Sequence, residues 1–194
     1  MRSSIIAPCS RFGGDHFAVY TKEKGLKKVL KEFLEECKGL NGGKTLPVRI
    51  GVYPDNWGSV SAATACDRAK IACDTKKDAY VSHIEYFNDA MLKQAEERQY
   101  IIDNLDRALT EGWIHVYHQP IVRAANGRVS DEEALARWID PEIGFLRPDR
   151  FIPVLEDSML LYKLDLYVAE QILKKMKAQA EGGLYIVPES VNLS

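Results

Sequence analysis

The feature that most constrains the fold of this chain is a long polar helix predicted for residues 88–111. The segment carries many charged side chains, contains no Gly or Pro before Gly112, and repeats its apolar residues at a spacing close to 3.5. A helix of this kind is typical of a connector between two folded units, and it could also pack on a second copy of itself. We therefore expect three segments, namely residues 1–87, a connector helix at 88–112, and residues 113–194.

The segment before the connector begins with a predicted β-hairpin. Gly13 and Gly14 lie between two short runs of strand character, Ser4–Pro8 and Phe17–Tyr20, and a Gly-Gly turn between such runs favours a hairpin. The periodicity then predicts an amphipathic helix, a strand, a helix rich in small side chains and a second strand, at residues 22–40, Leu46–Tyr53, 59–75 and His83–Phe87.

The segment after the connector alternates between strand and helix patterns. Ile114–Val122 and Val129–Trp138 are strand-like and are separated by an Asn126-Gly127 hairpin turn. Further along, the pattern predicts a helix following Pro148–Pro153, a helix at 159–180, and strand character at Leu184–Val187 and Val191–Leu193. Such alternation implies an α/β unit with a largely parallel sheet.

Composition restricts the partners and the compartment. The net charge of −2 provides no broad positive field, so we expect no nucleic-acid polymer as a partner. No apolar run approaches the roughly 18–20 residues that a membrane span needs, and Met1–Ala7 is too short for a signal peptide. The cysteines lack metal-binding CxxC spacing, which favours free thiols in a reducing cytoplasm, although zinc or disulfide use stays open; they are Cys9, Cys37, Cys66 and Cys73.

Two sets of motifs carry a resemblance to a known family. Arg11–Phe17, which reads RFGGDHF, is similar to the GGDEF signature of diguanylate cyclases. Val116–Val122 resembles the YYQPIV strand of EAL domains, Glu133–Trp138 contains the EAL signature itself, and Val191–Ser194 resembles the NLS strand of that family. In this order, the motifs resemble a tandem GGDEF–EAL protein of bacterial cyclic-di-GMP signalling.

The resemblance implies an overall α/β class. The first half would be the C-terminal part of an α+β GGDEF-like domain with a mostly antiparallel sheet. The second half would be the N-terminal part of a TIM-like β/α barrel, the EAL domain. The family often has Gly where this chain has Met159.

For the GGDEF-like half, the resemblance implies a degenerate turn made of Gly13, Gly14, Asp15 and His16. His16 stands where the family has an acid, and an imidazole is a poor ligand for Mg²⁺. We expect no diguanylate cyclase activity and a regulatory role for this half. The alternative, a plain hairpin turn with no ligand, is favoured over any surviving GTP site.

For the EAL half, the resemblance implies a metal site and a nucleotide site. Glu133 and Asn192 would bind Mg²⁺ or Mn²⁺, since carboxylate and amide oxygens suit these ions. Gln119, Leu135 and Arg137 would bind cyclic-di-GMP. By themselves, the three acids at 131–133 would suggest a solvated strand end, and Arg137 would suggest a surface ion pair.

The function implied for the parent protein is metal-dependent hydrolysis of cyclic-di-GMP to linear pGpG. The remaining acidic ligands, the paired Asp motif and the Lys of the family are not found in these residues, so we expect no complete catalytic set and no activity from this chain alone. The alternative is a non-catalytic cyclic-di-GMP receptor or dimerisation scaffold. We expect a homodimer formed through the connector helix or the EAL domain, and a cytoplasmic location, although parts missing upstream could tether the parent to a membrane.

Overall fold

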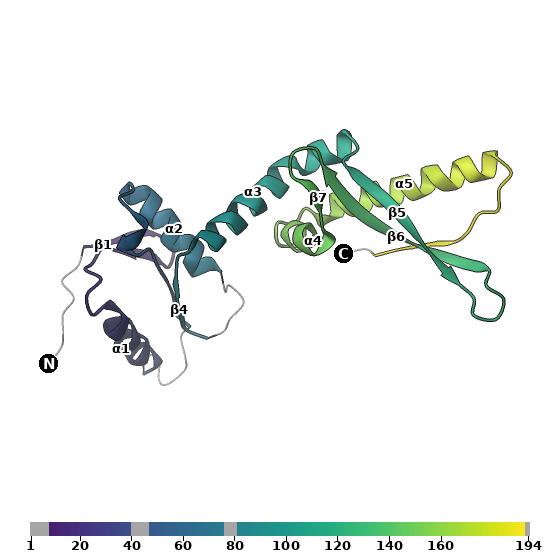
Figure 1. The fold of residues 1–194 in the computed structure, drawn as a ribbon. Coiled ribbons are helices and arrows are strands. Elements are labelled where there is room, and N and C mark those ends of the chain that lie inside the picture. The colour runs from purple at the N-terminus through teal and green to yellow at the C-terminus, as the bar shows by residue number, and fades with distance from the viewer. Residues whose placement is uncertain (1–7, 40–46, 76–80, 193–194) are drawn as a thin grey trace. The chain divides into compact units, whose positions relative to one another are not determined.

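The computed structural model of the chain describes residues 8–39, 47–75 and 81–192. The chain divides into two compact units, Met1–Ala95 and Glu96–Ser194, and each is described here by itself. The long helix α3, Asp89–Thr110, contributes residues to both units (Figure 1). Its bounds confirm the long helix that the uninterrupted polar pattern predicted.

In the residues described for the first unit, the strands form two two-stranded sheets. Strand β1, Cys9–Gly13, is antiparallel to β2, His16–Val19, whereas β3, Arg49–Val52, is parallel to β4, His83–Tyr86. The expectation of a mostly antiparallel sheet is therefore wrong for the second pair. A crossover containing helix α2, Ala62–Asp74, joins β3 to β4, and such a crossover allows neighbouring strands to run in the same direction.

The predicted hairpin is confirmed at β1 and β2. Gly13 and Gly14 have φ values of 127° and 54°, which side chains with a Cβ rarely adopt, so the turn requires glycine. The first strand is Cys9–Gly13 rather than the predicted Ser4–Pro8, of which residues 4–7 lie outside the described part of the chain. The other elements of this unit are α1, η1 and α2, at Leu26–Lys38, Asp55–Trp57 and Ala62–Asp74.

The second unit is built on strand β6, Val129–Asp140, which pairs with three other strands. Strand β5, Ile114–Val122, is antiparallel to it, and so is β7, Gly144–Leu146. Strand β8, Glu189–Val191, pairs in parallel with residues 132–134 of β6. The expected largely parallel sheet is therefore wrong for this part of the chain, because tight reversals join β5 to β6 and β6 to β7. Leu184–Val187 is not a strand.

Helices cover one face of this sheet. α5, Leu161–Glu181, and α4, Pro148–Asp157, pack with the end of α3 against the buried sheet residues Ala134 and Trp138. The Trp138 and Phe151 rings meet edge to face, with their centroids 5.7 Å apart. The remaining buried members of this core are Ile101, Leu105, Ala108, Trp113, Ile114, Leu146, Leu155, Leu164, Val168 and Ile172.

Two predictions from composition can be compared with the structure. No helix within the described ranges is long and apolar enough to cross a bilayer. All four cysteines are free thiols, of which Cys37 is buried and Cys9 is exposed.

Candidate metal and ligand site

The predicted site residues of the EAL half lie on one face of the β5–β6 pair. Ala134 and Trp138 of β6 point into the core, so the alternation of a strand directs Glu133, Leu135 and Arg137 to the opposite face. Gln119 of β5 is the direct cross-strand partner of Glu133. We call this side of the sheet the ligand face. The structure thus brings four of the predicted residues to one surface that the helices leave uncovered.

Asn192, the fifth predicted residue, reaches the same place from β8. Glu133 is paired with Ser190, and Asn192 follows two residues later on the same side of its strand. The Asn192 Nδ2 donates a hydrogen bond to Glu133 Oε1 at 3.2 Å. The two residues predicted as metal ligands, although distant in sequence, are therefore neighbours.

This pair fits the coordination of a hard divalent cation. A half-turn of the Asn192 amide would place its oxygen, rather than its nitrogen, near Glu133, and the two orientations are nearly isosteric. Adjacent oxygens around Mg²⁺ with bonds of roughly 2.0–2.1 Å lie about 3 Å apart, close to the observed 3.2 Å separation. Such an ion, when bound, would lower the pKa of a coordinated water and stabilise negative charge on a phosphoryl oxygen.

Arg137 lies over an aromatic ring instead of against an acid. Its guanidinium carbon is 6.0 Å from the centroid of the Tyr117 ring, and its Nη1 donates to the Ala136 carbonyl at 3.0 Å. Within the described part of the chain, no ion pair to Arg137 is recorded, so the surface ion pair considered as an alternative is not seen. A guanidinium at this distance is attracted by the ring, and its remaining N–H groups stay suited to a phosphate.

The GGDHF turn has the geometry of an ordinary exposed hairpin. Arg11 donates from both Nε and Nη2 to the Gly14 carbonyl, at 2.9 and 2.6 Å, and thereby fixes the turn. The side chains of Asp15 and His16 are exposed. These observations agree with a hairpin that has a conformational role, which is the alternative that the sequence favoured.

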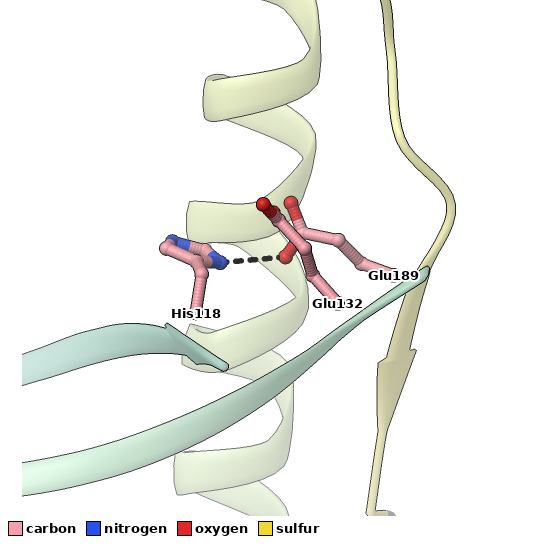
Figure 2. A group of neighbouring side chains, drawn as sticks. All are labelled: His118, Glu132 and Glu189. Carbon is pink, nitrogen blue, oxygen red and sulfur yellow. Dashed lines mark hydrogen bonds and ion pairs between the residues drawn. The ribbon is translucent and has the colours of Figure 1, made fainter. Parts of the chain in front are cut away.

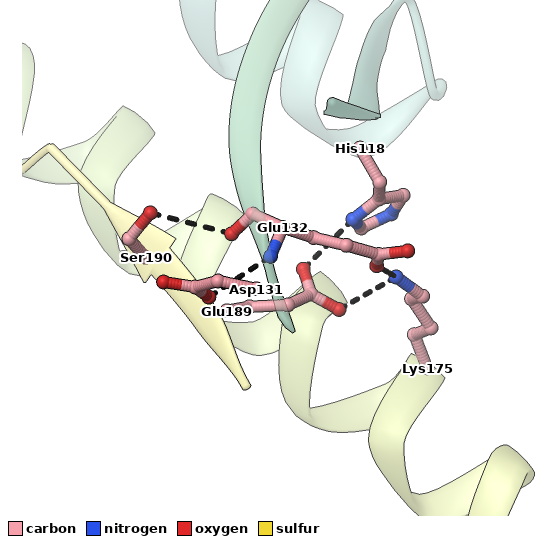
Figure 3. A network of polar contacts seen from close by, with 6 residues as sticks. All are labelled: His118, Asp131, Glu132, Lys175, Glu189 and Ser190. Atoms are coloured by element: carbon pink, nitrogen blue, oxygen red, sulfur yellow. Dashed lines mark hydrogen bonds and ion pairs between the residues drawn. The ribbon is translucent and has the colours of Figure 1, made fainter. Parts of the chain in front are cut away.

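A group of charged residues that the sequence analysis did not single out lies on the helix-covered side of the same sheet. His118 Nδ1 lies 2.7 Å from Glu189 Oε2, and Glu132 lies beside them (Figure 2). Lys175 of α5 donates to Glu189 Oε1 at 2.7 Å and also to Glu132 Oε2 (Figure 3). His115, three residues from His118, is exposed on the opposite side of the strand. We call His118, Glu132, Lys175 and Glu189 the lysine cluster.

The lysine cluster could hold a metal by its ligand types, but the Lys175 ammonium already pairs with both of its carboxylates. The imidazole and carboxylate atoms of His118, Glu132 and Glu189 lie within 4.8 Å of one another. Burial alone would lower the pKa of Lys175, but its hydrogen bonds and attraction to Glu132 and Glu189 outweigh this effect and raise that pKa. The ammonium is thus held charged where a cation would bind. Alternation along the hairpin could have placed His118 and Glu132 on one side of the sheet, but it could not have brought in Lys175 and Glu189.

Comparison with known families finds a match in the later part of the chain. Residues 102–194 match the family described as the EAL domain. The motifs that resemble this family, from Val116 to Asn192, lie on strands β5 and β6 and at the end of β8.

Individual relatives extend this similarity over more of the chain. Cyclic di-GMP phosphodiesterase NbdA of Pseudomonas aeruginosa is 26% identical over 91% of this chain and 23% of its own length. The bifunctional diguanylate cyclase/cyclic di-GMP phosphodiesterase MucR of the same organism is 25% identical over 95% of this chain and 28% of its own. The chain thus spans about a quarter of the length of these curated relatives.

Solved EAL structures are also similar to this chain. A PaMucR phosphodiesterase bound to c-di-GMP is 30% identical, with a TM-score of 0.45, over 49% of this chain and 38% of that one. The FimX EAL domain of Xanthomonas citri in complex with c-diGMP is 16% identical, with a TM-score of 0.45, over 53% of this chain and 39% of that one.

Proposed function

We propose that this chain acts in cyclic-di-GMP signalling and that its ligand face forms part of a metal-dependent site for cyclic-di-GMP. Glu133 and Asn192 would bind Mg²⁺ or Mn²⁺. Gln119, Leu135 and Arg137 would contact the dinucleotide, and the guanidinium of Arg137 would bind one of its phosphates. The observation that carries this proposal is the contact between Glu133 and Asn192, which joins two predicted ligands across 59 residues of sequence.

The proposed reaction of the whole protein is hydrolysis of cyclic-di-GMP to linear pGpG. Relatives such as NbdA are named as cyclic-di-GMP phosphodiesterases, which supports this reaction. A metal at Glu133 would activate a water and neutralise the charge that develops on the attacked phosphate. The nearby Arg137 would offset the charge of the second phosphate.

We propose a regulatory, non-cyclase role for residues 1–87. MucR is named as bifunctional, and its similarity covers 95% of this chain, which supports a GGDEF-like origin for this half. His16 in place of an acid removes one oxygen ligand that the two metal ions of a cyclase would need.

Binding to the chain of 194 residues tests the proposed site. We expect calorimetry to detect cyclic-di-GMP binding that depends on Mn²⁺ and is abolished in Glu133→Gln. Arg137→Met should weaken dinucleotide binding by about tenfold, the usual effect of losing a charge-assisted hydrogen bond, while leaving Mn²⁺ binding unchanged. Exposed Arg147, paired with Asp149 on the surface at 3.0 Å, offers the matched control Arg147→Met. Binding that is unaffected by Glu133→Gln would contradict the assignment.

A second candidate function is a cyclic-di-GMP receptor without catalysis. The contact between Glu133 and Asn192 and the position of Arg137 over Tyr117 would serve binding without turnover as well as hydrolysis. Chromatographic detection of pGpG after incubation of the full-length protein with Mn²⁺ separates the two candidates. Binding without pGpG would support the receptor.

A further inference from the structure

The pairing of β8 with β6 places two negative charges directly opposite each other. Glu132 of β6 and Glu189 of β8 are register partners on the helix-covered side of the sheet. Like charges in this position destabilise a strand pair. Strand β8 is three residues long, so few backbone hydrogen bonds oppose that repulsion. The short strand therefore needs a positive charge close to both acids.

Lys175 supplies this charge from α5. Its ammonium donates to both carboxylates, and the second oxygen of Glu189 is 2.7 Å from His118 Nδ1 (Figure 3). The Glu189 side chain is 0% exposed, and those of Lys175 and Glu132 are 25% and 20% exposed. Because the acid of β8 is buried, loss of its partner would leave an uncompensated charge that water cannot solvate.

Two further hydrogen bonds join β6 to the segment 188–190. Ser190 Oγ donates to the Glu132 carbonyl at 3.3 Å, and the Glu132 backbone N–H donates to the Pro188 carbonyl at 2.9 Å. The lysine cluster thus lies at the point where β8 is attached, and there it adds side-chain contacts to these few backbone and hydroxyl contacts.

The two sides of the sheet are linked through adjacent residues. Glu133 follows Glu132 directly and points to the ligand face, while Asn192 lies three residues after Glu189 and also points there. The hydrogen bond between Asn192 and Glu133 therefore forms only when β8 is docked on β6. Contacts on one side of the sheet hold together the ligand pair on the other.

We propose that Lys175, assisted by His118, is a positioning residue that holds β8 on β6 and thereby places Asn192 beside Glu133. It acts without touching the metal or the dinucleotide. The attachment of β8 stands on the contacts alone. Its consequence for metal binding rests on the proposed function, in which Glu133 and Asn192 are the metal ligands.

Amide hydrogen exchange of residues 189–191 tests the attachment. In Lys175→Met, which keeps the aliphatic stem but removes the charge, we expect exchange to be about tenfold faster because the strand opens more often. Lys175→Arg should restore protection. The matched control is Lys174→Met, which removes the neighbouring ammonium from its surface ion pair with Glu170 at 2.8 Å. Equal exchange in Lys175→Met and the wild type would overturn the proposal.

The double variant Glu132→Gln/Lys175→Met gives a sharper test. If repulsion between the facing acids detaches β8, neutralising Glu132 should recover most of the protection that Lys175→Met loses. This variant also serves if Lys175→Met alone fails to fold. No recovery would show that Lys175 does not act by balancing these two acids and would reject the mechanism.

Mn²⁺ affinity, measured by calorimetry, tests the consequence for the ligand face. We expect Lys175→Met to weaken Mn²⁺ binding about tenfold at a temperature well below its unfolding transition, and Lys175→Arg to restore it. Glu133→Gln in the Lys175→Met background identifies any Mn²⁺ that binds the vacated cluster instead. If Lys175→Met speeds amide hydrogen exchange in β8 but leaves Mn²⁺ affinity unchanged, Lys175 does not position the metal ligands. If the wild type also binds no Mn²⁺, the proposed function fails, while hydrogen exchange still decides the attachment of β8.

Discussion

At the scale of single residues, Asp140 shows how one buried acid organises a turn. Its side chain is 2% exposed and accepts hydrogen bonds from the Tyr100 hydroxyl at 2.9 Å and the Trp138 indole at 3.2 Å. The backbone N–H groups of Glu142 and Ile143 also donate to it. Burial would raise the pKa of Asp140, but these donors outweigh burial and lower it, so the acid stays ionised.

Tyr100, which donates a hydrogen bond to Asp140, should make the second unit less stable at alkaline pH. Burial, together with the hydrogen bond and charge of Asp140, raises the pKa of Tyr100 to about 12. A raised pKa favours the protonated folded form, so this contribution to stability is complete below the unfolded pKa of about 10 and is lost as the pH rises toward 12.

Removal of the Tyr100 hydroxyl tests this predicted loss of stability at alkaline pH. Tyr100→Phe should cost about 1 kcal/mol near neutral pH and remove this part of the alkaline loss. Urea titration followed by tryptophan fluorescence at pH 8 and pH 11 measures both effects. Tyr162→Phe, at a side chain that is 55% exposed, is the control. An unchanged alkaline loss in Tyr100→Phe would contradict the assignment.

Met159 is held in a backbone conformation that suits glycine. Its φ is 56°, and its side chain is 82% exposed at the end of α4. A Cβ in the left-handed region costs roughly 1–2 kcal/mol, and little packing is lost when an exposed side chain is removed. We expect Met159→Gly to stabilise the chain by about 1 kcal/mol, as measured by urea unfolding. Ser158→Gly, at φ −93°, should destabilise it instead; a destabilised Met159→Gly would refute the strain argument.

The residues of the site could be found from sequence only where a motif marked them. Gln119, Glu133, Arg137 and Asn192 stand out through their resemblance to EAL motifs, and the structure places them on one face. Lys175 and Glu189 belong to no such motif. Their role depends on the register between β6 and β8, which is a tertiary property that local pattern does not contain.

At the scale of elements, helix periodicity was a better guide than strand direction. The four long predicted helices are present with slightly tighter bounds, because an amphipathic repeat is a local signal. The antiparallel pair of β5 and β6 agrees with the hairpin predicted at Asn126-Gly127, whereas strand β7 and its pairing with β6 were missed. Three-residue strands such as β7 and β8 are too short to show alternation, and their pairing is decided by partners elsewhere in the chain.

The packing of α2 on β3 depends on the absence of one side chain. A Cβ on Gly51 would lie 1.8 Å from the Ala69 carbonyl oxygen and 2.6 Å from the Cys73 backbone nitrogen. Both are backbone atoms of the helix and cannot turn away. We expect Gly51→Ala to destabilise the first unit by about 3 kcal/mol, measured by thermal unfolding followed by circular dichroism.

Gly39→Ala is the control for this prediction. A Cβ there would meet only the Glu36 carbonyl oxygen at an ordinary 3.5 Å. The first unit should therefore tolerate that change, and equal stability of the two alanine variants would contradict the close packing of helix and strand.

At the scale of the whole molecule, the ligand face carries exposed apolar side chains beside its polar ones. Those exposed by between 41% and 58% are Tyr117, Ile121, Ile139 and Phe145. Exposed apolar patches of this kind favour association. We expect the 194-residue chain to self-associate in a concentration-dependent way, as measured by light scattering after size-exclusion chromatography.

A charged substitution on this face should reverse the association. Ile121→Glu combined with Phe145→Glu should shift the chain toward the monomer, whereas Tyr20→Glu, at an exposed residue of the first unit, should not. A wild-type chain that stays monomeric at all concentrations would refute the prediction.

Strand β6 carries a carboxylate toward each side of the sheet at successive positions, Glu132 and Glu133. A slip of one residue in this strand would exchange one acid for the other, so charge alone barely distinguishes the two registers. The volume of the core side chains distinguishes the two registers. Ala134 and Trp138 lie in the helix-covered core, whereas their neighbours Leu135 and Ile139 do not. Packing of the Trp138 indole against Phe151 therefore helps to fix the register of β6 and, with it, which acid points to the ligand face. Replacing Trp138 with a smaller side chain should therefore make the register of β6, and the choice between Glu132 and Glu133 on the ligand face, less well defined before the sheet unfolds.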